Sequence, residues 1–294
     1  MFADINARVD EFLTDASKGP HGRRVHALVD GALLSQSGDE RFARAWRAQP
    51  SNSLFPTSTS DTAKAVGPLL IDLTSLSPTA RLALVDHTQE LSIASLLTSL
   101  LDVDELARRL SPFTNVLLPD RTDMIMRFQD PRVLPAWLTI LDPACEAYLG
   151  SCCNTWTFVD PSWRLQTIDF ASRLAPQAPT FPLTLSDAAQ AKLERDCFPH
   201  TVISRFRRED RSTLERIPLH ARYDFFSDQI ARAKAHGLES FPDIEVYCSL
   251  AIEFGPAFDE RPAFDDILGE FARGGGLAHA AARCGTAGLS MHAS

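Results

Sequence analysis

Apolar and polar positions in the first half of the chain follow two different periods. Short, mostly apolar runs at residues 25–31, 67–73 and 156–159 are bounded by turn-forming residues and predict strands. Residues 39–48 and 102–110 carry apolar side chains every three or four positions, which indicates amphipathic helices. Strands that alternate with helices in this way predict a mixed or parallel sheet with helices packed on it.

Other segments of this half are less regular. The run at residues 91–101 fits both strand and helix spacing, and we favour a strand that passes into a helix. Residues 156–159 and 163–166 flank an Asp-Pro-Ser turn and predict a hairpin. Short helices are also expected near residues 5–13 and 78–84.

Residues 124–134 combine a strand pattern with a helix start. Apolar side chains alternate with other residues over 124–129, which predicts a strand. Asp130 is a good N-cap because its carboxylate accepts free backbone N–H groups, and Pro131 suits the first helical position. The apolar residues that follow have helical spacing: Leu134, Trp137, Leu138 and Leu141.

The composition changes after residue 170. Prolines appear first, and helical patterns without strands then begin near residues 186, 214, 242 and 262. Gly237 and Gly255 stand where two of these helices are expected to end. We therefore predict an α/β lobe over residues 1–170, containing a mixed sheet with flanking helices, and an all-α lobe over residues 171–294.

Composition and charge narrow the class of protein. The chain has 294 residues, of which 45% are hydrophobic, and a formal net charge of -9. The one arginine-rich run, residues 205–211, is interrupted by two acids, so we expect no nucleic-acid partner. The first residues lack the pattern of a signal peptide and no apolar run is long enough to span a bilayer. We expect a cytoplasmic protein without membrane insertion.

The usual catalytic and cofactor motifs are absent from the sequence. It contains no G-x-S-x-G, H-E-x-x-H, G-x-G-x-x-G or phosphate-binding P-loop, and its six cysteines form no C-x-x-C pair. Cys152 and Cys153 are adjacent, and we expect them to be unreactive thiols rather than a disulfide. We expect no cofactor, no metal and no enzymatic activity.

Three acids near predicted strand ends leave one enzymatic alternative open. Asp30, Asp72 and Asp130 would converge if they lay at the carboxyl ends of parallel strands, where ligands bind. A metal-dependent hydrolase or phosphotransferase is then conceivable, with Arg127 steadying a phosphate. The competing interpretation, which we favour, is that Arg127 forms a structural ion pair with Asp30 or Asp72.

Several short motifs, taken in order, resemble one known family. They lie within about residues 24–150 and comprise Ala27-Leu28-Val29-Asp30-Gly31-Ala32, Leu54-Phe55-Pro56, Gly67-Pro68-Leu69-Leu70 and Arg127-Phe128-Gln129-Asp130-Pro131-Arg132-Val133-Leu134. In this order they resemble the bacterial type VI secretion effector chaperones, also called adaptor proteins. The family commonly has an aromatic residue where Gln129 stands.

The resemblance implies a non-enzymatic protein that binds a cognate toxin effector and assists its loading onto the valine-glycine-repeat spike protein. The helical lobe would then vary with the effector. The motif residues that either hold the fold or contact the partner are Asp30, Gly67, Pro68, Arg127, Asp130, Pro131 and Arg132.

Overall fold

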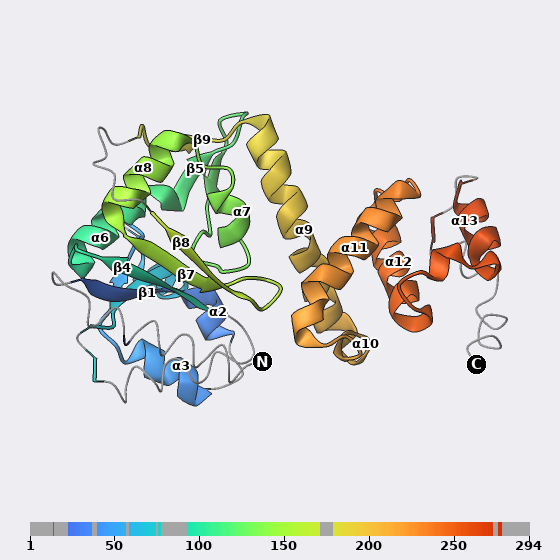
Figure 1. The fold of residues 1–294 in the computed structure, drawn as a ribbon, viewed down its shortest axis with the longest axis horizontal. Coiled ribbons are helices and arrows are strands. Elements are labelled where there is room, and N and C mark those ends of the chain that lie inside the picture. The colour runs from blue at the N-terminus through green and yellow to red at the C-terminus, as the bar shows by residue number, and fades with distance from the viewer. Residues whose placement is uncertain are drawn as a thin grey trace. The chain divides into compact units, whose positions relative to one another are not determined.

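The chain divides into two compact units, Met1–Asp196 and Cys197–Ser294 (Figure 1). This computed structural model describes residues 14, 23–36, 40–56, 59–74, 76–77, 93–170, 179–272 and 276–277. The helices expected near residues 5–13 and 78–84 lie outside the described residues. The predicted fold class is confirmed, because strands and helices build the first unit and helices build the second.

A six-stranded sheet forms the centre of the first unit. All of its neighbouring strands pair antiparallel. In spatial order the strands are β2 (Asn52–Ser53), β3 (Pro68–Asp72), β1 (Arg24–Asp30), β4 (Ala94–Ser99), β7 (Thr155–Val159) and β8 (Leu165–Asp169). The hairpin expected from the sequence is β7–β8, and the ambiguous run 91–101 supplies β4.

The central position of β1 in the sheet explains why its sequence is almost continuously apolar. Every residue after Arg24 is buried, because β1 is paired on both sides and both faces of the sheet are covered at this point. One face packs in a cluster with helix α3 (Glu40–Arg47) through Trp46. The antiparallel register aligns Asp30 with Pro68 and His26 with Asp72. The carboxyl ends of β1 and β3 therefore lie at opposite ends of the sheet.

A small second sheet has the order β6 (Asp123–Ile125), β5 (Asn115–Leu117) and β9 (Leu183–Thr184). It is mixed, since β5 pairs antiparallel with β6 and parallel with β9. The backbone N–H of Leu185 also donates to the carbonyl of Leu117. These bonds attach residues 183–185 to the first unit, so the compact unit extends past the boundary expected after residue 170.

Four described helices of the first unit begin at polar caps. Asp30, Ser60, Asp102 and Asp142 each accept a backbone N–H from the first turn of the helix that follows. The helices of this unit are α2 (Gly31–Ser35), α3 (Glu40–Arg47), α4 (Asp61–Val66), α6 (Val103–Leu110), the 3₁₀ turn η1 (Ser111–Thr114), α7 (Leu134–Leu138) and α8 (Pro143–Cys152).

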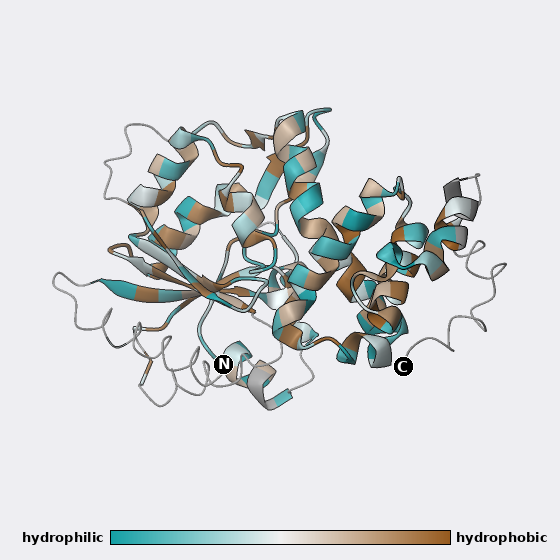
Figure 2. Cartoon of the chain, turned by 45° about the vertical axis from the view of Figure 1, so that its right-hand side comes forward, coloured by the Kyte–Doolittle hydropathy of each residue, from teal (hydrophilic) through white to brown (hydrophobic). Residues whose placement is uncertain are grey.

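The second unit is helical around an apolar core that includes Val202, Phe226, Tyr247 and Phe258. In Figure 2 its helices carry hydrophobic and hydrophilic residues in alternation, as expected for amphipathic helices. Its elements are α9 (Asp187–Glu209), which begins in the first unit, α10 (Arg211–Glu215), η2 (Leu219–Ala221), α11 (Arg222–Ala235), α12 (Phe241–Phe254), η3 (Phe258–Glu260), η4 (Pro262–Phe264) and α13 (Asp265–Ala272).

Two glycines end helices where the sequence predicts it. Gly237 follows α11 with a φ of 78°, and Gly255 follows α12 with a φ of 100°. A side chain is strained at such angles, so glycine is the favoured residue at both positions. Among the described helices, none is both long and apolar enough to cross a lipid bilayer.

Candidate functional site

Asp30 is a buried carboxylate at the end of β1 whose two oxygens are both used. Its Oδ1 accepts the backbone N–H of Leu33 at 2.9 Å, which caps helix α2. Its Oδ2 accepts one hydrogen bond from Arg127 Nη2 at 2.8 Å and another from Gln129 Nε2 at 3.2 Å. Asp30 is fully buried, so these donors replace the water that a charged carboxylate would otherwise require.

Asp130 is a second buried carboxylate close to the first. Arg127 Nη2 lies 3.3 Å from its Oδ2, so one guanidinium bridges Asp30 and Asp130. Arg132 approaches the other side in a two-point contact, with Nε 2.9 Å from Oδ1 and Nη2 2.7 Å from Oδ2. Burial raises the pKa of Asp130, but the hydrogen bonds and charge of Arg132, with a smaller effect of Arg127, hold it below its ordinary value.

These five side chains, Asp30, Arg127, Gln129, Asp130 and Arg132, form what we call the carboxylate cluster. Two arginines balance two buried carboxylates, which offsets part of the cost of burying the charges. The guanidinium side chains of Arg127 and Arg132 remain 42% and 25% exposed. The predicted ion pair of Arg127 is therefore present, with Asp30 rather than Asp72 as its partner.

The backbone between residues 124 and 134 differs from the prediction in two places. Strand β6 ends at Ile125, and the chain then turns, with the N–H of Asp130 donating to the carbonyl of Arg127. Helix α7 begins at Leu134, so Asp130 is not its N-cap. Instead, the Asp130 carboxylate accepts the backbone N–H and the guanidinium of Arg132. The carboxylate therefore stabilises the local turn and not the N-terminus of helix α7.

Gly31 and Gly67 meet where the two other motifs approach each other. The N–H of Gly31 donates to the carbonyl of Gly67 at 3.0 Å. A Cβ on Gly31 would lie 2.4 Å from the carbonyl oxygen of Ala65, and one on Gly67 would lie 2.4 Å from the ring of Phe55. Pro68 begins β3 opposite Asp30, and its carbonyl accepts the N–H of Leu54. The motifs are therefore joined by close backbone contacts.

Aromatic side chains pack behind the carboxylate cluster. Phe128 is stacked on Trp137 with ring centroids 5.0 Å apart, and both rings contact Trp156 edge-on. The indole N–H of Trp156 donates to Ser95 in β4, so its polar atom is satisfied. Pro131 is also buried. The segment that supplies Arg127 and Arg132 is consequently anchored in the core of the first unit.

The structure does not bring the three strand-end acids together. Asp72 lies opposite His26, at the other end of β1 from Asp30, and it contacts Arg24. Within the described residues, no group of three or more His, Cys, Asp or Glu is placed to hold a metal ion. The enzymatic alternative required Asp30, Asp72 and Asp130 to converge at the ends of parallel strands, and they do not, because β1 and β3 are antiparallel.

Cys145, Cys152 and Cys153 are free thiols, as expected for the last two. Burial raises the pKa of Cys145 to about 12 and that of Cys152 to about 11, and it raises the pKa of Cys153 as well. A raised pKa lowers the thiolate fraction at neutral pH, and the thiolate is the reactive form. These thiols are therefore poor nucleophiles.

Two features of the site were missed in the sequence. Gln129 donates to Asp30, although its Oε1 atom is buried without a hydrogen-bond partner in the described part of the chain. The need for glycine at position 31 comes from the carbonyl of Ala65, a contact between distant segments. Only the Asp-Gly pair after an apolar run hinted at a tight turn there.

A third buried carboxylate, Asp259, organises part of the second unit. It accepts hydrogen bonds from Arg232 and from Tyr247 Oη at 2.6 Å, and His236 Nε2 lies 3.0 Å away. Burial raises the pKa of Asp259, but the bonds from Arg232, Tyr247 and His236 outweigh burial and lower it to about 2. This network fastens the turn after α12 to helices α11 and α12.

Comparison with known proteins adds one finding to this geometry. Residues 25–146 match a family described as a domain of unknown function (DUF4123). That family is associated with type VI secretion effector adaptors. The matched residues run from β1 into α8 and contain the whole carboxylate cluster. The match covers less than half of the chain and leaves out the second unit. No curated protein and no solved structure matched the chain.

Proposed function

We propose that this protein is a cytoplasmic, non-enzymatic adaptor that binds a cognate toxin effector and assists its loading onto the valine-glycine-repeat spike protein. The observation that carries the proposal is the family match over residues 25–146, which contains all of the motifs that the structure joins at the end of β1. A binding role of this kind requires a stable platform and no reacting group.

The geometry of the carboxylate cluster suits a structural task. Its charged groups are paired with one another, and its two carboxylates are buried. Such a cluster holds the C-terminal end of β1 and the segment before α7 in fixed positions relative to each other. The outer side of Arg127 is the part of the cluster that is most exposed to solvent.

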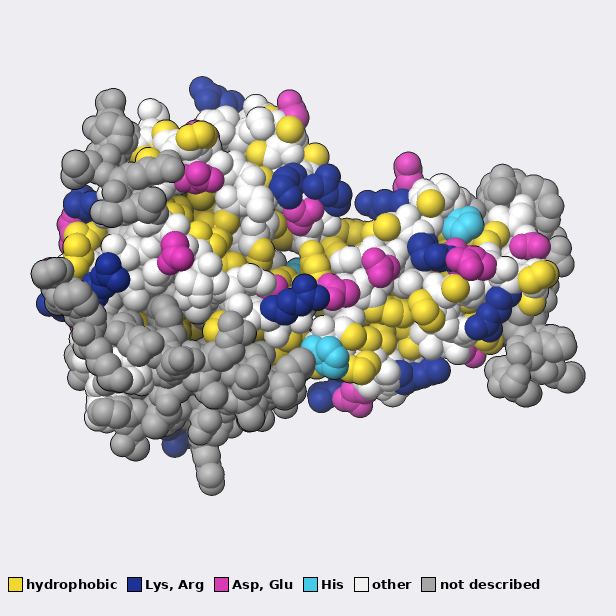
Figure 3. All heavy atoms as spheres, in the orientation of Figure 1, with side chains coloured by type: hydrophobic (Ala, Val, Ile, Leu, Met, Phe, Trp, Pro, Cys, Tyr) yellow, Lys and Arg dark blue, Asp and Glu magenta, His cyan; other side chains and the backbone are white. Residues whose placement is uncertain are grey.

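The surface is compatible with a protein partner. On the face drawn in Figure 3, basic and acidic side chains are interspersed among hydrophobic ones, and the formal net charge is -9. A protein that binds nucleic acid through phosphates concentrates basic residues on one face. This distribution favours a protein partner over a nucleic acid.

Co-purification tests the proposal directly. The tagged protein is expressed with the product of the neighbouring gene, and the expected result is a complex that survives size-exclusion chromatography. A toxin from an unrelated secretion cluster serves as the control and should not bind. Failure of the cognate pair to associate would contradict the adaptor function.

Secretion tests the loading step. Deleting the gene should stop export of the cognate toxin while other substrates of the same machine are still exported. The spike protein should capture the toxin from a lysate only when the adaptor is present. Capture that is equally efficient without the adaptor would contradict a role in loading.

A further inference from the structure

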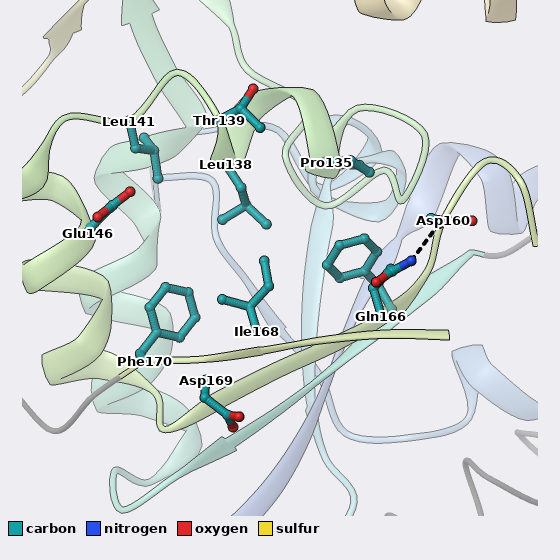
Figure 4. Close-up of a pocket in the computed structure, with 11 residues that line it drawn as sticks. Pro135, Leu138, Thr139, Leu141, Glu146, Asp160, Gln166, Ile168, Asp169 and Phe170 are labelled. Atoms are coloured by element: carbon teal, nitrogen blue, oxygen red, sulfur yellow. Dashed lines mark hydrogen bonds between the residues drawn. The ribbon is translucent and has the colours of Figure 1, made fainter. Parts of the chain in front are cut away.

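A hollow of about 630 Å³ lies in the first unit, and no residue of the carboxylate cluster lines it. Helix α7 and the start of α8 border it on one side, and strands β7 and β8 form its floor (Figure 4). We call it the β8 groove. Its lining residues are Pro135, Leu138, Thr139, Leu141, Glu146, Phe158, Asp160, Gln166, Ile168, Asp169 and Phe170.

The floor of the β8 groove is apolar. In Figure 4, Leu138 and Ile168 point toward each other across the hollow, and Phe170 lies beside Ile168. Ile168 and Phe170 are only partly buried, so hydrophobic surface stays in contact with solvent. A partner side chain that covered this surface would gain free energy by removing apolar area from water.

All charged residues that line the groove are acidic. Glu146 lies at one end and Asp160 at the other, while Asp169 points to the opposite side of β8 (Figure 4). Asp160 is held in place, since it accepts bonds from the N–H of Arg164 and from Gln166. Glu146 is exposed and forms no ion pair with any described residue. The groove is therefore complementary to a positively charged partner.

One edge of the strand beside the groove has no partner strand among the described residues. In the described part of the chain, β8 pairs with β7 only. The N–H of Phe170 donates to Asn154 and that of Asp160 donates to Arg164, which fixes which pairs of the ladder are hydrogen-bonded. Since such pairs alternate in an antiparallel ladder, the N–H and C=O groups of Leu165, Thr167 and Asp169 point away from β7. These groups can bond to an added strand.

We propose that the β8 groove binds an extended segment of the toxin effector by adding it as a strand to β8. The segment places alternate apolar side chains over Leu138, Ile168 and Phe170, and a Lys or Arg beside Glu146. This inference rests on the proposed adaptor function and names the surface and the chemistry of recognition. The apolar floor, the acidic ends and the strand edge without a described partner favour this occupant jointly.

A peptide array tests the chemistry of the partner. Overlapping 15-residue segments of the toxin that co-purifies with the adaptor are probed with the labelled full-length protein. The expected binders alternate apolar residues with other residues and contain Lys or Arg. Binding only of acidic segments, or of no segment while the intact toxin still binds, would overturn the inference and leave the adaptor function standing.

Variants of the edge strand test the location. Thr167 is exposed, and its N–H points outward, so Thr167→Pro removes a donor for the added strand without removing a bond to β7. Thr167→Val also loses the side-chain contact with Thr157 but keeps the N–H, and so measures the effect of the hydroxyl alone. Relative to Thr167→Val, we expect Thr167→Pro to bind the best peptide about five- to tenfold more weakly, which matches one lost hydrogen bond.

A charge reversal gives a second, independent variant that leaves the strand intact. Glu146→Lys should weaken the same peptide, and this loss should shrink at high salt. Glu239→Lys, an equal charge change at an exposed site of the second unit, is the matched control. Unchanged peptide affinity in both Thr167→Pro and Glu146→Lys would overturn the inference.

Sedimentation tests whether a second copy of this chain, and not the toxin, occupies the edge of β8. If the wild-type protein dimerises and Thr167→Pro makes it monomeric, the edge serves self-association and the inference fails. If the wild-type protein does not bind the toxin at all, the adaptor function fails with it. Binding of the toxin with undiminished affinity by both groove variants rejects the groove alone.

Discussion

Arg127 Nη2 lies 2.8 Å from Asp30 Oδ2, although 97 positions separate the two residues in the sequence. The contact joins the end of the central strand to the segment before α7. Because Asp30 is fully buried and also caps α2, one carboxylate connects three elements of the first unit. The ion pair therefore belongs to the framework of this unit.

Arg127→Ala should destabilise the protein. The substitution leaves Asp30 buried with Gln129 and Leu33 as its remaining donors, and it also removes a contact of Asp130. Since the Arg127 side chain is 42% exposed, we expect a loss of about 1–3 kcal/mol, less than for a fully buried pair. Urea denaturation measures it, with Arg44→Ala, at an arginine side chain that is 78% exposed, as the control.

The same variant separates two roles of the arginine. If Arg127 is structural, toxin capture should fall in proportion to the folded fraction and recover at low temperature. Normal stability with abolished toxin capture would instead identify Arg127 as a residue that contacts the partner.

Gly67→Ala should destabilise the protein, and Phe55→Ala should reverse part of the loss. The new methyl group would lie 2.4 Å from the Phe55 ring, and shortening that side chain removes the obstacle. We expect the free energies of unfolding of the two single variants and the double variant to be non-additive by about 1 kcal/mol or more. Strict additivity would contradict the contact. Gly269→Ala meets no atom within 4 Å and is the matched control.

Gly31→Ala should be more damaging than Gly67→Ala and should not be rescued by Phe55→Ala. Its methyl group meets the backbone carbonyl oxygens of Ala65 and Gly67, which cannot be shortened by substitution. Melting temperatures of Gly31→Ala, Gly67→Ala and the double variant Gly31→Ala/Phe55→Ala measure which substitution is more damaging and whether it is rescued. A melting temperature for Gly31→Ala equal to that of the wild-type protein would contradict the close approach.

Because of the Asp259 network, the second unit should lose stability at acid pH. Although burial alone would raise the pKa of Asp259, its hydrogen bonds lower it to about 2, below the value of about 3.9 in an unfolded chain. The stabilising contribution is therefore complete above the unfolded value and is lost as the pH falls from about 4 to about 2. Circular dichroism during an acid titration follows the loss.

Tyr247→Phe removes one donor to Asp259 and should move that acid transition to higher pH. Tyr148→Phe, in the first unit, is the matched control because its hydroxyl contacts the carbonyl of Arg109 instead. An acid transition of Tyr247→Phe that coincides with that of the wild-type protein would show that the bond does not stabilise the carboxylate.

Alkylation should distinguish the described cysteines. Cys197 is partly exposed, whereas Cys145, Cys152, Cys153 and Cys248 are buried. Burial also raises the pKa of Cys248 to about 12. Brief treatment of the native protein with iodoacetamide should modify Cys197 before these four, as measured by peptide mass spectrometry. Rapid modification of Cys152 in the folded protein would contradict its burial.

Much of the fold followed from local chemistry. The apolar run before Asp30 became β1, and the helix predicted over residues 102–110 is α6, capped by Asp102. Gly237 and Gly255 ended their helices for the expected conformational reason. In each case neighbouring residues suffice, because caps, turns and helical spacing act over only a few positions.

The parts that were missed depend on contacts between distant residues. The direction of β3 relative to β1 decides whether Asp30 and Asp72 share an edge, and no local pattern records that direction. Strand β9 has two residues and owes its position to pairing with β5. Asp130 is an exception, because its carboxylate bonds to Arg132, only two positions away, and not to a helix terminus.

The edge of β8 without a partner strand among the described residues has a consequence for solubility. An unpaired strand is a template on which copies of the same protein can stack and aggregate. Asp169 on the strand, together with Glu146 and Asp160 nearby, would place like charges face to face if two copies met there. The acids that would face a basic segment would therefore also oppose the addition of a second copy of this chain to β8.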